Sequence, residues 1–195
     1  TLNSTQLCFH LNKNTNYSAS ALSFIASHVL HNPKRIVVRT GDGSILFAHM
    51  LNVQFLDTIG FTHIVLASSN MFWIRQGMET FVLRNDISVG LEGVRHQHLK
   101  APVEMRKSNI YKHLSNNFTR ELWSYHEGTF YPKYIVTRFT EYVSAFNKND
   151  FINHLHFPEE FWLQTYALNH DNRTFHKHSL PLCWRIPGSK NTPIE

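Results

Sequence analysis

Strand-length and helix-length apolar segments alternate through the first 70 residues, and this alternation constrains the fold more than any other feature. The order strand, helix, strand, helix, strand is typical of a parallel sheet with right-handed crossover connections. We therefore predict an α/β fold with a mostly parallel central sheet. The predicted strands cover 6–12, 35–40 and 62–69, and the predicted helices cover 18–32 and 45–60, the second ending at Gly60.

Ligands of such sheets bind beyond the carboxyl ends of the strands. In this chain, those ends lie near Asn12, near the turn "RTGDGS" (39–44) and near "SSNMF" (68–72). A turn between a strand and a helix can present backbone amides to a phosphate, and Arg39 would add a fixed positive charge. A plain turn with a helix cap is the alternative, because neither G-x-x-x-x-G-K-[ST] nor G-x-G-x-x-G is present.

The rest of the chain is less regular. The segment 84–126 is polar with weak periodicity, amphipathic helices are predicted over 133–146 and 158–170, and the tail from 171 has the prolines of extended or loop structure. Because no stretch resembles a linker, we expect a single domain over 1–195. Its two halves are 1–83, whose strand ends and turns are expected to bind phosphate, and 84–195.

Charge and hydropathy limit the partners. The net charge of +5 and the pI of about 9.3 suit an anionic ligand, but Lys and Arg are scattered, so we expect phosphate of a small ligand and no nucleic acid. A nucleic-acid-binding domain would instead show steeply salt-dependent affinity. No apolar stretch is long enough to span a bilayer, so membrane contact is expected only through segments outside this chain.

Metal and thiol chemistry have little support. Histidines occur in three H-x-H pairs, at 96/98, 154/156 and 176/178, but no third ligand follows at a recognisable offset, and the chain has no D-x-D. Cys8 and Cys183 are interpreted as two buried thiols, with one terminus-to-terminus disulfide as the alternative. Four N-x-S/T sequons leave the compartment open, and no G-x-S-x-G indicates a serine hydrolase.

Two adjacent carboxylates, Glu159 and Glu160, follow Pro158 at the start of the last predicted helix. Proline and acidic residues are favoured in a first helical turn, so the pair has a purely structural interpretation. Alternatively, a carboxylate at a helix start can act as a general base if apolar neighbours adjust its pKa. The aromatic residues Phe157, Phe161 and Trp162 would supply such neighbours.

In their order, these motifs resemble the core-2/I-branching β-N-acetylglucosaminyltransferase family from about Cys8 to Leu168. The first anchors pair "FHLNKN" with H-V-D-x-K, "NPKRIVVRTGDGSILFAHMLN" with a Gly-rich turn and A-x-L-N, and "FTHIVLASSNMFWIRQGMETFV" with S/C-G-x-D-x-P-L. The later anchors pair "EGTFYPKYIVTRFTEYV" with S-G-S-A-Y and "FPEEFWLQTY" with S-P-D-E-x-x-W-A-T.

The resemblance implies a Rossmann-like GT-A fold and an inverting glycosyl transfer, from a UDP-sugar or another nucleotide-sugar to a carbohydrate hydroxyl, without a cofactor or divalent metal. The general base would be Glu160, and Glu127 and Trp162 would contact the acceptor. Expected donor-binding residues are Asn12, Arg39, Thr40, Gly41, Asp42, Gly43, Asn70, Arg185 and Lys190.

Departures from the family pattern leave alternatives. Asn12 and Asn70 stand where the family has acids, so the donor sugar is not fixed by the resemblance. A module of GT-A-like fold that binds carbohydrate or nucleotide without catalysis is the second hypothesis. A eukaryotic member of the family would work in the Golgi lumen, whereas a bacterial or viral member would be cytoplasmic. The small number of cysteines favours the cytoplasmic location.

Overall fold

The computed structural model describes residues 5–39, 41–67, 71–73, 77–88, 103–123, 126–147, 158–171 and 183–185. For residues 28, 71–73, 103–104, 109–110, 114 and 183–185 only the backbone is described. The strands are β1 (Cys8–Phe9), β2 (Leu30–His31), β3 (His63–Val65), β4 (Met71–Trp73), β5 (Phe130–Pro132) and β6 (Cys183–Arg185). The helices are α1 (Ala19–His28), α2 (Ser44–Ile59), α3 (Met78–Asn85), α4 (Val103–Lys107), α5 (Asn109–Ser115), α6 (Lys133–Ser144), the 3-10 turn η2 (Pro158–Glu160) and α8 (Trp162–His170).

The described strands form small sheets of two strands each. β1 and β2 are parallel and are joined by α1, whereas β3 pairs antiparallel with β5 and β4 pairs antiparallel with β6. The mixed α/β class is therefore confirmed. The predicted parallel sheet through the first three strands is not formed by the described residues, because β3 takes its partner from a segment more than 60 residues later in the chain.

The strand predicted over 35–40 is wrong for its described part, because 35–39 is irregular. This segment runs beside the end of β1, where Lys13 N donates to Ile36 O at 2.9 Å. Farther along, the Asn12 side chain takes the place of a backbone partner for Val38. Its Nδ2 donates to Val38 O at 2.8 Å, and its Oδ1 accepts from Val38 N at 3.3 Å. The second parallel strand is instead the pair of residues directly after α1.

Helix predictions agree with the structure more closely. α2 begins one residue before the predicted start and stops where expected, at Gly60, whose φ of +96° ends the helix. α6 covers most of the predicted 133–146. The helix predicted over 158–170 is divided, because 158–160 is a 3-10 turn and α8 begins at Trp162.

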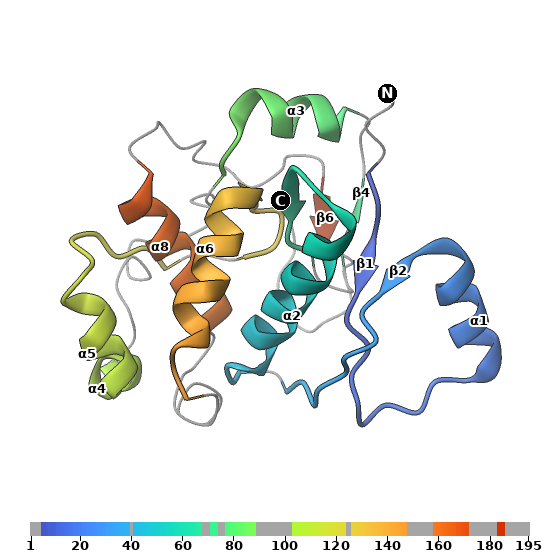
Figure 1. Cartoon of the computed structure of the whole chain (residues 1–195), viewed down its shortest axis with the longest axis horizontal. Helices are drawn as coiled ribbons and strands as arrows, with labels where there is room; N and C mark the ends of the chain where they lie inside the picture. Colours follow the sequence, from blue (N-terminus) through green and yellow to red (C-terminus); the bar gives the residue numbers. More distant parts are fainter. Residues whose placement is uncertain are drawn as a thin grey trace.

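A helical layer holds most of the core. α6 lies between α2 and α8 and packs against both, while α1 extends from the opposite side of the molecule beside β2 (Figure 1). The predicted apolar face of α6 is buried at Ile135, Phe139 and Val143. Burial of these side chains drives the packing of the layer. The facing residues include Leu46, Met50 and Val53 of α2 and Phe161, Trp162, Leu163, Tyr166 and Ala167 at the start of and within α8.

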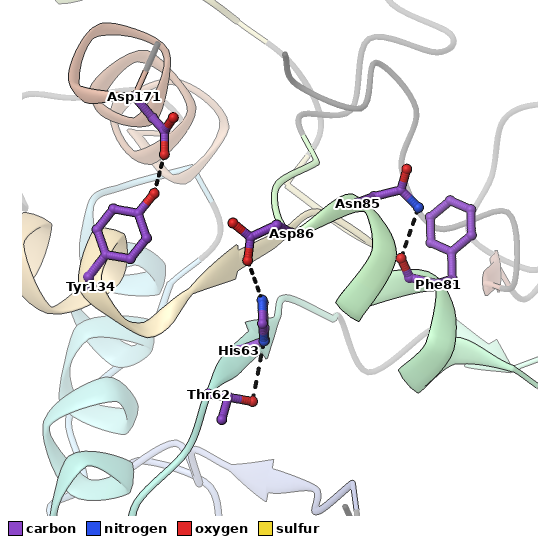
Figure 2. A network of polar contacts seen from close by, with 7 residues as sticks. All are labelled: Thr62, His63, Phe81, Asn85, Asp86, Tyr134 and Asp171. Carbon is purple, nitrogen blue, oxygen red and sulfur yellow. Dashed lines mark hydrogen bonds and ion pairs between the residues drawn. The ribbon is translucent and has the colours of Figure 1, made fainter. Parts of the chain in front are cut away.

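Polar contacts attach the flanking elements to this layer (Figure 2). His63 on β3 donates from Nε2 to Asp86, at 2.7 Å, and its Nδ1 lies 3.2 Å from the Thr62 hydroxyl. Asp86 follows α3, so the contact joins α3 to β3. The Tyr134 hydroxyl of α6 donates to Asp171 at the end of α8. Both contacts fix helix ends beside β3 and β5.

Two further predictions concern the thiols and the bilayer. Cys8 is a free thiol, so it does not form the alternative disulfide, and burial raises its pKa to about 11. A thiol with a raised pKa is a poor nucleophile at neutral pH. Over the described ranges, no helix has the length and apolar character needed to cross a membrane.

Candidate functional site

The turn before α2 is closed by its own polar groups. Ser44 N donates to the Asp42 carboxylate at 2.8 Å, and the Ser44 hydroxyl accepts from Arg39 N at 2.8 Å. Asp42 therefore lies at the N-terminus of α2, where its negative charge is favourable. A phosphate at this turn would compete with that carboxylate for the Ser44 amide. The bonds therefore agree with the alternative interpretation of this segment as a turn with a helix cap.

A second turn, at 126–129, is anchored on β3. Leu66 N donates to Thr129 O at 2.9 Å and Gly128 N donates to Leu66 O at 2.8 Å. Gly128 has a φ of +76°, which favours glycine, and the Thr129 hydroxyl donates to His126 O at 2.6 Å. These bonds hold Glu127 at the tip of the turn, where its side chain is 18% exposed.

The third segment is η2, which carries the acidic pair. η2 packs against α2 and α8. Glu159 is buried, with 2% of its surface exposed, whereas Glu160 is half-buried. The Glu159 atom Oε2 is sealed from solvent and has no hydrogen-bond partner in the part of the chain described. The two neighbouring carboxyl groups thus have different environments.

Residues of all three segments act electrostatically on Glu159. Burial raises the Glu159 pKa to about 8, and repulsion from Glu160, Glu127 and Asp42 adds to the effect. These four residues, from segments far apart in sequence, are the carboxyl cluster: Asp42, Glu127, Glu159 and Glu160. Three of its members are partly exposed, and the fourth, Glu159, lies beneath the surface.

Histidines adjoin the cluster through Glu127. His126 Nδ1 lies 3.7 Å from Glu127 Oε2, and its ring centroid is 5.5 Å from that of His49 on α2. Burial, with additional repulsion from His126, lowers the His49 pKa to about 3, so this ring is neutral at pH 7. His10 is a further neighbour of His49, and its Nε2 accepts from Ile36 N at 3.2 Å.

The cluster can accept several hydrogen bonds from hydroxyl groups, since each ionised carboxylate is acceptor-only. It is a poor site for a diphosphate, because like charges repel and neither α2 nor α8 carries a Lys or Arg. No group of three or more His, Cys, Asp or Glu among the described residues is arranged to hold a metal ion.

The predicted site residues are distributed as follows. Glu160, Glu127 and Asp42 are each near enough to Glu159 to raise its pKa, and Gly41 and Gly43 form the turn that carries Asp42. The Asn12 side chain is occupied in bonds to Val38, and the exposed Arg39 closes the turn through its backbone. Thr40, Asn70 and Lys190 lie outside the described residues, and Arg185 is in β6, where only the backbone is described.

Trp162 needs a correction. It was expected to contact the acceptor, yet only 1% of its surface is exposed and its ring lies 4.8 Å from that of Phe161 in the core. A ring that stacks on a sugar needs an exposed face. Trp162 is instead part of the hydrophobic core that adjoins η2. His49 and His126 were missed, because isolated histidines in a helix and a loop carry no motif.

A scan of the chain against models of known protein families and a search of curated proteins gave no match.

Proposed function

We propose that the protein is an inverting glycosyltransferase that moves a sugar from a nucleotide-sugar, with a UDP-sugar as the expected donor, to a carbohydrate hydroxyl. Glu160 is the general base. The observation that carries the proposal is that Glu160, Glu127 and Asp42 each raise the pKa of the buried Glu159, which supports a common site for the predicted base and the predicted acceptor-binding carboxylate. Glu160 is also partly exposed, as a base that meets a substrate must be.

The chemical step is a single displacement. The Glu160 carboxylate takes the proton of the acceptor hydroxyl while its oxygen forms a bond to the anomeric carbon. The bond from that carbon to the diphosphate oxygen breaks on the opposite face, and the diphosphate leaves with the electron pair. The configuration is inverted, as in inverting glycosidases. Glu127 accepts hydrogen bonds from the acceptor sugar and orients it.

The leaving diphosphate needs positive charge, which the carboxyl cluster does not supply. In the proposal it lies away from the cluster, where Arg185 and Lys190 of the tail and Arg39 neutralise it. A GT-A-like arrangement belongs to the same proposal. The parallel unit β1, α1, β2, with the α2 turn following in sequence, is the feature that supports it.

A second candidate function has its own observation. The Asp42 carboxylate occupies the N-terminus of α2, where a nucleotide phosphate would otherwise accept hydrogen bonds. The alternative is a carbohydrate- or nucleotide-binding module without catalysis, and the occupied helix N-terminus favours its carbohydrate-binding form. Such a module binds glycans through the carboxyl cluster and releases no nucleotide.

Thermal-shift measurements with a panel of UDP- and GDP-sugars, in the presence of EDTA, test the proposal first. Preferential binding to the folded state raises Tm with ligand concentration. We expect one nucleotide-sugar to stabilise the protein in chelator and to release its nucleoside diphosphate when a glycan acceptor is added. Binding without release over long incubation supports the module. No stabilisation by any member of the panel contradicts the transferase, and no stabilisation by glycans either contradicts the module.

A further inference from the structure

Among the residues that the structure describes, no cation compensates the buried acid Glu159. The elements packed against η2 are α2 and α8. α8 contains no Lys, Arg, Asp or Glu, and the acidic residue of α2, Asp57, is at the far end of that helix, 2.6 Å from Lys133. Within the described ranges, the charged groups that act on Glu159 are Glu160, Glu127 and Asp42, and His49 interacts in turn with Glu127.

An ionised carboxylate in this position would be costly. Its Oε2 atom is excluded from water and has no hydrogen-bond donor among the described residues, so the backbone N–H of Glu159 itself offsets only part of the cost of burying the charge. The neighbouring carboxyl groups would add repulsion. The proton-bound form avoids both costs, and a Glu159 pKa raised to about 8 by burial agrees with this geometry.

We propose that Glu159 is a positioning residue that keeps its proton at neutral pH and leaves Glu160 as the charged member of the pair. The role of Glu160 as base in this statement rests on the proposed function. Adjacent carboxyl groups in unlike environments divide the acid and base roles between them. The partly exposed Glu160 is accessible to a substrate, whereas the buried Glu159 is not.

The uncharged Glu159 acts on Glu160 by removing repulsion. If both groups were ionised, the two negative charges would oppose each other in a water-poor site and would push the Glu160 side chain away from the cluster. A neutral neighbour instead allows Glu160 to remain beside Glu127 and the incoming hydroxyl. Ionisation of Glu159 at high pH should therefore weaken transfer even though the base itself stays charged.

Urea unfolding of the wild type, Glu159→Gln and Glu160→Gln across pH tests the proton assignment without a substrate. A carboxyl group whose pKa is raised on folding loses stabilisation as pH rises from the unfolded value of 4.5 to the folded value of about 8. The wild-type unfolding constant, divided by that of Glu159→Gln, should rise about tenfold per pH unit in this window. The same ratio for Glu160→Gln should change much less. A flat ratio for Glu159→Gln overturns the proposal.

Infrared spectroscopy of the unmodified protein provides a measurement that does not depend on how the variant folds. The carbonyl band of a protonated carboxyl group should be present at neutral pH and should disappear above about pH 8. Absence of this band at neutral pH overturns the assignment, whatever the variant does.

The transfer reaction separates this inference from the proposed function. Glu159→Gln, which imitates the protonated acid, should keep transfer at neutral pH and should extend it above about pH 8, where the wild type loses activity. A residue with only a structural role would not move this pH profile. Loss of transfer in a folded Glu159→Gln overturns the proposal. If the wild type itself shows no transfer but its pH-dependent unfolding differs as expected, the proposed function fails and the proton assignment stands.

Discussion

Thr165 and Leu122 form a reciprocal pair of buried hydrogen bonds across 43 residues of sequence. The Thr165 hydroxyl oxygen accepts from Leu122 N at 2.9 Å and lies 3.1 Å from Leu122 O, to which the hydroxyl donates. One side chain of α8 thereby satisfies both backbone groups of a residue that belongs to no helix or strand. The pair fixes α8, and with it η2, against the segment that leads to the turn at 126–129.

Thr165→Val should therefore destabilise the protein. The change keeps the shape of the side chain but leaves a buried N–H and a buried C=O without their partner, at a cost of about 1–3 kcal/mol for each group. We expect the free energy of unfolding, measured in urea, to fall by about 2–4 kcal/mol.

Thr140→Val is the matched control, since Thr140 is also buried but donates only to Val136 O of its own helix, at 2.7 Å. The Val136 carbonyl belongs to the backbone of α6 and keeps its helical hydrogen bond when the Thr140 hydroxyl is removed. The control should therefore lose less stability than Thr165→Val. Equal losses in the two variants would show that the Leu122 bonds contribute nothing particular.

Asn12 offers a test between a structural role and a role in donor binding. Its side chain bonds both backbone groups of Val38, so Asn12→Ala should lower the free energy of unfolding by about 1–2 kcal/mol. The exposed Asn14 is the control, and Asn14→Ala should be close to neutral. If Asn12→Ala leaves stability unchanged and only weakens nucleotide-sugar binding, the structural assignment is wrong.

His49 should make the protein sensitive to acid. Burial lowers its folded-state pKa from 6.5 to about 3, so the unfolded chain binds a proton between these values while the folded protein does not. Stability linked to His49 is complete above about pH 6.5 and is lost as pH falls towards about 3, at roughly 1 kcal/mol per pH unit.

The free energy of unfolding of the wild type and of His49→Gln should be compared across this pH range. Glu159, which stabilises the folded protein as pH falls, is present in both proteins, so its contribution cancels in the difference. The wild type should lose stability relative to the variant as pH falls. A difference that does not depend on pH would mean that the His49 ring takes up a proton in the folded protein.

Local patterns in the sequence predicted the helices better than the strand pairing. The apolar spacing of Ile135, Phe139 and Val143 is a property of a single segment, as is the stop at Gly60, and both are present in the structure. The antiparallel pairing of β3 with β5 depends on residues far apart in the chain, which periodicity does not report. The failed strand at 35–39 has a similar cause, because the Asn12 side chain replaces the ladder there.

The candidate site was partly accessible from sequence. Proline followed by two acids identified the start of the last helical segment, but the structural interpretation explained both acids by the helix dipole and did not distinguish them. Glu159 is instead buried, and a 3-10 turn separates it from α8. Which of two adjacent carboxyl groups faces the core depends on how η2 packs against α2, and this packing has no sequence signature.

The most direct measurement compares nucleoside diphosphate release by the wild type, Glu160→Gln and Glu141→Gln, using a nucleotide-sugar that raises Tm. Glu141 is an exposed carboxylate of α6 and serves as the control. We expect Glu160→Gln to bind the nucleotide-sugar but to lose transfer by about 100-fold or more, the usual contribution of a general base. The control should match the wild type. Turnover by Glu160→Gln at the wild-type rate would contradict the assignment of Glu160 as the base.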